Sequence, residues 1–264
     1  MNFSSFLSLA PSIETARNRV SVQLISRAKE SGRSSLFEFE SEKLARAYGI
    51  PVEKAGMART VTEALTISKK IGFPLVMKIV SQDVLHKTDV GGVKIGINSP
   101  SEVKSSFTEI IRNVKKHNRT ARIEGVYLQK MAPKTYEFVI GGTRDKQFGP
   151  TVMFGLGGIY VELYKDVSFR LAPVSDEEAK SMLLEIRAAP LLTGFRDSKP
   201  LDLGAIISVI KSVGRMLMDL KDIDSIDINP LLVYEKACKA VDVRVVLTGQ
   251  PSSASPSELS SKQA

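Results

Sequence analysis

Hydrophobic residues repeat along the chain in two patterns. Apolar residues at helical spacing, closed by stop signals such as Gly49 and Gly72, predict helices at 41–48, 62–71, 176–187 and 203–220, and another that Ser101 caps. Short apolar or alternating runs predict strands at 52–58, 75–80, 91–97, 126–131, 136–141, 151–154, 225–234 and 239–247. The polar segment 12–33 is compatible with a helix.

These elements predict an α+β chain of two lobes that meet in a crease near residue 125. We expect an N-terminal helical segment at 1–33, a first lobe at 34–124 and a second at 125–249. Residues 250–264 are rich in serine and offer little to bury, which predicts a disordered tail. No repeat of 20–50 residues is visible.

Composition excludes a few classes of protein. The net charge of +8 would suit nucleic acid, but basic residues are spread along the chain and aromatic residues make up only 6%, without tryptophan. The same charge would attract phosphates, nucleotides or an acidic partner. No apolar run approaches the roughly 20 residues that span a bilayer. A single cysteine, Cys238, allows no internal disulfide or metal cluster and suits a cytoplasmic protein. We therefore expect neither nucleic acid nor membrane as a partner.

The last two predicted strands alternate polar and apolar residues. Because side chains alternate between the faces of a strand, four polar residues share one face: Asp227, Asn229, Asp242 and Arg244. A turn centred on 235–236 would place Asn229 opposite Asp242, and Asp227 opposite Arg244, with Cβ atoms roughly 4.5–5.5 Å apart. Asn229 and Asp242 could then share Mg²⁺, although a solvated sheet face would carry the same residues without strain.

Lys78 interrupts an apolar, β-branched strand in which an unpaired ammonium group would be costly to bury. A phosphate ligand, a carboxylate neighbour or a side chain reaching the sheet edge would each explain it. Lys94 lies in the next predicted strand, with His86 midway between the two lysines. An antiparallel pairing about His86 would bring both lysines together, where they repel unless an anion lies between them. Gly91 and Gly92 would allow close approach of the backbone to phosphate.

His86 would ordinarily be an exposed loop residue or a hydrogen-bonded structural one. Its neighbours Lys87 and Asp89 supply a cation and a carboxylate that could position the imidazole for nucleophilic or acid–base chemistry. We expect His117, in a polar stretch, to lie on the surface.

A glycine-rich turn at 155–158 lacks the third glycine and the following helix of a dinucleotide-binding fingerprint, and the chain has no P-loop motif. The turn could still cradle an anion, and Arg170 could hold a phosphoryl group bidentately. The alternative is a tight hairpin with Arg170 on the surface.

Taken in order, several segments resemble the ATP-grasp fold, and closely the β subunit of ADP-forming acetyl-CoA or acyl-CoA synthetases, relatives of succinyl-CoA synthetase. The resemblance covers roughly residues 20–247. It rests on the segments 72–78, 85–94, 136–141, 154–158 and 226–231. It implies an ATP-grasp fold of two α/β lobes that hold a nucleotide between their sheets.

The resemblance also implies roles for single residues. Lys78 would contact the nucleotide phosphates, near Lys94 and the backbone of Gly91 and Gly92. Main-chain atoms of Gln129, Lys130 and Met131 would read adenine, and Glu137 would hold the ribose. Asn229 and Asp242 would bind Mg²⁺, in agreement with the strand pairing. His86 would carry or relay a phosphoryl group, oriented by Asp227, and Arg170 would neutralise charge.

In the family that the chain resembles, a CoA-binding α subunit delivers phosphate from its own phosphohistidine. The resemblance therefore implies the reaction acyl-CoA + ADP + Pi ⇌ carboxylate + CoA + ATP in an α2β2 assembly. No CoA-binding Rossmann domain is visible in these 264 residues, so we expect it on a partner chain or a fusion partner. The rival hypotheses are another ATP-grasp carboxylate ligase, a non-catalytic nucleotide-sensing subunit and a basic RNA-binding module.

Overall fold

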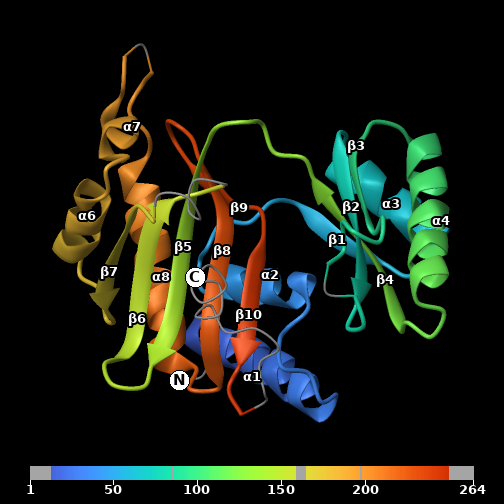
Figure 1. Cartoon of the computed structure of the whole chain (residues 1–264), viewed down its shortest axis with the longest axis horizontal. Coiled ribbons are helices and arrows are strands. Elements are labelled where there is room, and N and C mark those ends of the chain that lie inside the picture. Colours follow the sequence, from blue (N-terminus) through green and yellow to red (C-terminus); the bar gives the residue numbers. More distant parts are fainter. Residues whose placement is uncertain (1–12, 85, 159–164, 197, 250–264) are drawn as a thin grey trace, which may run out of the picture.

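The computed structural model describes residues 13–84, 86–158, 165–196 and 198–249. It has two lobes, each built on an antiparallel sheet with helices on one face (Figure 1). This confirms the predicted mixture of helices and strands. The predicted disordered tail lies outside the described residues. Within them, no helix is long and apolar enough to cross a membrane.

The first lobe contains a four-stranded sheet in the order β1-β4-β2-β3. Its strands are β1 (Ala55–Ala58), β2 (Leu75–Ser81), β3 (Val93–Ile97) and β4 (Ile123–Lys130). Helices α3 (Val61–Ile71) and α4 (Pro100–His117) pack on one face. Met77, Ile79 and Leu128 are fully buried beneath them. Lys78 alternates with these residues and therefore points to the uncovered face.

Caps define where these helices begin. The Thr60 hydroxyl accepts the Glu63 N–H at 3.2 Å, and Ser99 does the same for Glu102 at 3.2 Å. The predicted cap at Ser101 is therefore wrong by two residues, because Pro100 occupies the first turn of α4, where its missing N–H is harmless.

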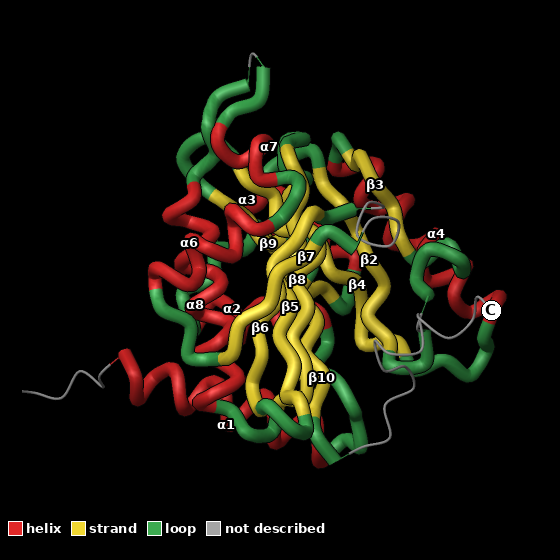
Figure 2. Tube along the Cα trace, turned by 60° about the vertical axis from the view of Figure 1, so that its left-hand side comes forward, coloured by secondary structure: helices red, strands yellow, loops and turns green. Residues whose placement is uncertain are grey.

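The second lobe contains a six-stranded sheet in the order β10-β8-β5-β6-β7, with β9 paired to β8. Its strands are β5 (Tyr136–Asp145), β6 (Gly149–Leu156), β7 (Val167–Leu171), β8 (Ile223–Val233), β9 (Cys238–Ala240) and β10 (Val243–Leu247). Helices α6 (Asp176–Glu185), α7 (Ala189–Thr193) and α8 (Leu203–Asp219) lie on one side (Figure 2). Strand β7 and helix α7 arise where the sequence patterns predicted no element.

Helices α1 (Ile13–Glu30) and α2 (Glu38–Ala47) pack with the second lobe rather than the first. Leu24, Leu44 and Ile50 are buried in one core with Val243 and Val245 of β10. Helix α2 also contacts β1, and so it lies between the two sheets (Figure 1). The predicted start of the first lobe at residue 34 is thus too early.

The predicted crease near residue 125 is also misplaced, because β4 runs through it and belongs to the first sheet. Gly125 takes a φ of +144°, and a Cβ there would come within 2.3 Å of the Ala58 carbonyl oxygen. Glycine is therefore required by the close approach of β4 to β1 and does not mark a turn between lobes. The chain passes to the second sheet at 131–135.

Candidate functional site

Acidic residues of α2 meet basic residues of the first lobe on the uncovered face of its sheet. Glu38 binds two lysines, with its Oε1 2.5 Å from the Nζ of Lys78 and its Oε2 2.7 Å from the Nζ of Lys87. The Glu38 side chain is only 5% exposed. A carboxylate neighbour was one of the three explanations for Lys78 that the sequence allowed, and Glu38 is that neighbour.

Attraction within this group outweighs desolvation. Burial alone would raise the pKa of Glu38, but Lys78 and Lys87 together hold it below its usual value. Burial would likewise lower the pKa of Lys78, yet Glu38 and then Asp242 hold it above its usual value. Glu38 and Lys78 are thus both charged at neutral pH.

One turn further along α2, Glu42 is fully buried and faces the same strand surface. Its carboxylate accepts hydrogen bonds from the hydroxyl of Tyr127 at 2.5 Å and from Nε2 of Gln129 at 2.8 Å. Nε2 of Gln129 also donates to the carbonyl of Val241 in the second lobe, at 2.9 Å. This network joins α2, the first sheet and the β9–β10 connection.

Burial raises the pKa of Glu42 to about 7, despite the hydrogen bond from Tyr127. The folded protein therefore holds a proton there that the unfolded chain releases near its ordinary pKa, so this group favours folding less as pH rises between about 4.5 and about 7. Glu42→Gln removes the titration, and its amide can still bond to Tyr127 and Gln129.

We expect the unfolding free energy of Glu42→Gln, relative to the parent chain, to increase by roughly 2–3 kcal/mol between about pH 5 and about pH 8. Urea denaturation across this range checks the prediction. A constant difference between the two proteins would show that Glu42 is ionised throughout.

The β8–β10 hairpin carries four polar side chains on its exposed face. Asp227 pairs with Arg244, and the N–H of Asn229 donates to the carbonyl of Asp242 at 3.2 Å. The predicted register, with a turn at 235–236, is confirmed. Asp242 interacts electrostatically with Glu38, Lys78 and Lys87, so this hairpin faces the charges of α2 and the first lobe. We call Glu38, Lys78, Lys87, Asp227 and Asp242 the interlobe junction.

The hairpin carboxylates lack sufficient positive charge around them. Desolvation by the surrounding protein, and then Asp242, raise the pKa of Asp227 to about 6, although Arg244 opposes them. Desolvation by the surrounding protein and then Glu38 likewise raise the pKa of Asp242, against the effect of Lys78 and Lys87. In the described part of the chain, no three His, Cys, Asp or Glu side chains converge on one metal position. Asp242 and Asn229 offer one carboxylate and one amide on adjacent strands, and Mg²⁺ typically takes one or two protein ligands and completes its shell with phosphate and water.

His86 is exposed in the loop between β2 and β3. The next residue, Lys87, is held twice, because its side chain binds Glu38 and its carbonyl accepts the Gly92 N–H at 2.7 Å. Consecutive Cα atoms lie about 3.8 Å apart, so the Cα of His86 lies next to that of Lys87, whose side chain belongs to the interlobe junction.

Comparison with known proteins identifies the family. Residues 27–247 match the ATP-grasp domain. The chain is 44% identical over 225 residues to the β subunit of acetate–CoA ligase [ADP-forming] I of Pyrococcus furiosus, covering 85% of this chain and 97% of that one. The chain belongs to the β subunits of ADP-forming acetate–CoA ligases.

Solved structures agree with this family. An acetyl-coenzyme A synthetase 1 of Candidatus Korarchaeum cryptofilum, in complex with coenzyme A, Ca-AMPCP and HgCl⁺, superposes with a TM-score of 0.82 at 48% identity, covering 86% of this chain and 99% of that one. A second structure of that enzyme, with coenzyme A and Mg-AMPPCP, has a TM-score of 0.77 at 45% identity, with the same coverage. Its phosphohistidine segment points towards the nucleotide-binding site.

In this ligase β subunit, the predicted pairing of Lys78 with Lys94 is wrong by one residue. Lys78 lies opposite Val93, and Lys94 lies opposite Met77. Leu75 keeps the predicted register, but an irregularity before Val76 shifts the rest of the strand. A one-residue shift moves a side chain to the other face. Lys94 therefore points towards α4, where its Nζ is 2.7 Å from Oε1 of Glu109, and it is not part of the interlobe junction.

Arg170 also lies away from the interlobe junction. It is opposite the buried Val152 and points towards α6, where it forms a bidentate ion pair with Glu185 and donates to Ser181 at 3.1 Å. The bidentate partner is a carboxylate of this chain, so the structure does not support the prediction that Arg170 holds a phosphoryl group. The sequence missed this because β7, which sets the direction of the side chain, was not predicted.

The glycines near the site serve local packing. The N–H groups of Gly91 and Gly92 donate to the carbonyls of Thr88 and Lys87, which closes the β2–β3 loop. A Cβ at Gly92 would lie 2.7 Å from Ile79. Their amides are therefore occupied within the chain, so they are not free to receive phosphate as predicted. The Gly157 N–H similarly donates to the Glu137 carbonyl at 2.8 Å.

The predicted adenine hinge lies where β4 ends and the chain crosses between lobes. The N–H groups of Lys130 and Met131 already donate to the carbonyls of Lys54 and Pro74, at 2.8 and 3.0 Å. Any main-chain contact to adenine here would therefore use other backbone groups. Glu137 is exposed on β5, on the same face as Gly141, which pairs with Asp227.

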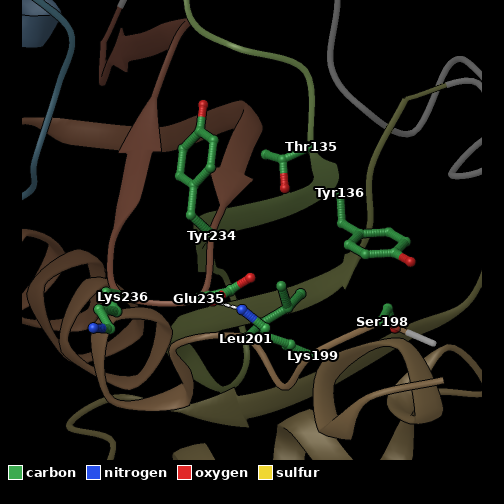
Figure 3. A pocket seen from close by; sticks show the side chains of 8 residues that line it. All are labelled: Thr135, Tyr136, Ser198, Lys199, Leu201, Tyr234, Glu235 and Lys236. Carbon is green, nitrogen blue, oxygen red and sulfur yellow. Dashed lines mark hydrogen bonds and ion pairs between the residues drawn. The ribbon is translucent and has the colours of Figure 1, made fainter.

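A separate hollow of about 750 Å³ lies at the end of the β8–β9 hairpin (Figure 3). It is lined by residues that include Tyr136, Leu201, Tyr234 and the ion pair between Lys199 and Glu235. Tyr136 and Leu201 pack with the hydrophobic core of the second lobe, so the hollow lies on the helix-covered side of the six-stranded sheet. It is therefore not the space at which the predicted site residues meet.

The sequence interpretation missed Glu38 and Glu42. It began the helix at Ser41, three residues too late, so Glu38 fell outside it. Carboxylates four residues apart lie on one face of a helix. The sequence feature that could have revealed them is their position beside the buried Leu44 and Ala45. An acidic pair on an inward-facing stripe requires buried basic or hydroxyl partners.

Proposed function

We propose that the interlobe junction binds Mg-ADP and passes to it a phosphoryl group that a partner subunit brings as phosphohistidine. The observation that carries this proposal is that Lys78 and Lys87 interact electrostatically with Asp242, whose carbonyl accepts the N–H of Asn229. Cations for phosphate therefore face oxygen ligands for Mg²⁺ across the junction. A bound Mg²⁺ would neutralise charge on the phosphates.

In the proposed sequence, His86 first takes the phosphoryl group, as the P–N bond of the partner's phosphohistidine breaks and a new P–N bond forms. A terminal oxygen of ADP then attacks the same phosphorus, so that ATP forms and His86 leaves as a free imidazole. Lys78 and Lys87 hold the nucleotide phosphates in line and offset the negative charge. In this proposal Asp227 orients the imidazole.

The partner would be a CoA-binding α subunit that makes the phosphohistidine from acetyl-CoA and phosphate. The Korarchaeum structures contain coenzyme A with a nucleotide analogue, and one of them also shows the phosphohistidine segment, which supports this division. Family membership favours it over the other ATP-grasp ligase, the nucleotide sensor and the RNA-binding module.

A reconstitution tests the proposal. The chain is mixed with a family α subunit, acetyl-CoA, phosphate and Mg-ADP, and ATP is measured by luciferase. We expect ATP only when both subunits are present. ATP formation by the α subunit alone, or Mg-ADP binding without any ATP formation in the complete mixture, would refute the proposal.

A further inference from the structure

Glu38 bridges two lysines that belong to different segments of the first lobe. Lys78 comes from β2, and Lys87 comes from the loop that carries His86. The exposed fractions of the three side chains are 5% for Glu38, 13% for Lys78 and 29% for Lys87. Each carboxylate oxygen receives one ammonium group, so Glu38 is fully engaged.

The carboxylate itself is anchored in the other lobe. Helix α2 buries Leu44 and Ala45 in the core beneath the second sheet, and it contacts β10. The same helix carries a second buried ion pair, in which Arg33 contacts Glu40 at 2.5 and 3.1 Å without contacting either lysine. Glu38 therefore projects from a helix that packs in the core of the second lobe, and its bonds to Lys78 and Lys87 link that helix to the first lobe.

We propose that Glu38 is a positioning residue that holds Lys78 and Lys87 together as one phosphate-binding pair. This role rests on the proposed nucleotide site. An ammonium group has three N–H donors, so each lysine keeps two for phosphate after binding Glu38. The group of one carboxylate and two ammonium ions retains a net positive charge. Without the carboxylate, the two cations would repel each other and separate before the nucleotide arrives.

Mg-ADP and adenosine distinguish this role, because adenosine has no phosphate for the lysines to contact. In Glu38→Gln the amide accepts from one lysine but presents its own NH₂ group to the other. We expect the dissociation constant for Mg-ADP, measured by calorimetry on the full chain, to rise about 10- to 100-fold. The affinity for adenosine, measured by competition, should stay within about twofold.

Glu40→Gln is the matched control. It weakens another buried ion pair of the same helix, with Arg33, without touching either lysine. Its affinity for Mg-ADP should equal that of the parent chain. Lys87→Met is a second variant. It is less prone to misfolding than Glu38→Gln, because the Lys87 side chain is partly exposed to solvent. It should also weaken Mg-ADP binding and spare adenosine.

Three results would overturn the role of Glu38. They are unchanged or tighter Mg-ADP binding by folded Glu38→Gln, an equal loss in Glu40→Gln, and an equal loss of adenosine binding. If Glu38→Gln does not fold, unchanged Mg-ADP binding by Lys87→Met would overturn it instead. A parent chain that does not bind Mg-ADP would refute the nucleotide site itself, which separates the two failures.

Discussion

Replacing His86 with asparagine is expected to lower ATP formation by the reconstituted enzyme about 10⁴-fold or more, because the group that accepts the phosphoryl in the proposed relay is lost. Asparagine has a similar size and polarity but no nucleophilic ring nitrogen. Since His86 is exposed and contributes little to packing, the variant should fold and bind Mg-ADP as the parent chain does. Initial rates of ATP formation, together with calorimetry, check both parts.

His117 provides the control, as the second of the two histidines in the chain. It ends α4 on the helix-covered side of the first sheet, and His117→Asn should retain the parent rate. Activity in His86→Asn within about tenfold of the parent would contradict the relay, and would favour direct transfer from the partner to ADP.

Lys78→Met is expected to lower kcat/KM for ADP by about 10²- to 10³-fold, because the proposed site loses a largely buried cation that would stabilise the phosphoryl group in transfer. Methionine keeps the apolar stem of lysine and so preserves most of the packing on β2. It leaves Glu38 with Lys87 alone, and that loop cation cannot occupy the strand position of Lys78. Steady-state kinetics with varied ADP measures the effect.

Lys94→Met is the matched control for this prediction. Lys94 lies on the neighbouring strand but on the opposite face, where it pairs with Glu109 in a partly exposed ion pair. Such pairs contribute only about 0–1 kcal/mol to stability. The variant should therefore keep kcat/KM within about twofold of the parent. A greater loss in Lys94→Met than in Lys78→Met would contradict the observed strand register.

The sequence predicted the β8–β10 hairpin well because strict alternation and a short turn leave few possible registers. Asp227, Asn229 and Asp242 consequently lie on the face that the pattern indicated. The β2–β3 pair was less predictable. Its connecting loop contains a turn closed by Gly92, and its strand has an irregularity beside Leu75. Counting residues about His86 could not reveal either feature.

The predicted lobe boundaries were wrong for a different reason. Glycine at position 125 serves a close contact between β4 and Ala58, yet in sequence it looks like a turn. The assignment of α2 depended on tertiary packing, because its apolar stripe could have covered either sheet. Glu38 became recognisable only once that packing brought it to Lys78 and Lys87.

One measurement tests the central claim most directly. A family α subunit is first labelled with [³²P]phosphate and acetyl-CoA, freed of small molecules, and then mixed with this chain and Mg-ADP in a rapid-quench experiment. The account predicts that label leaves the α subunit and appears in ATP only when this chain is present, passing through an acid-labile form on this chain. Label that stays on the α subunit while Mg-ADP is bound to this chain would contradict it.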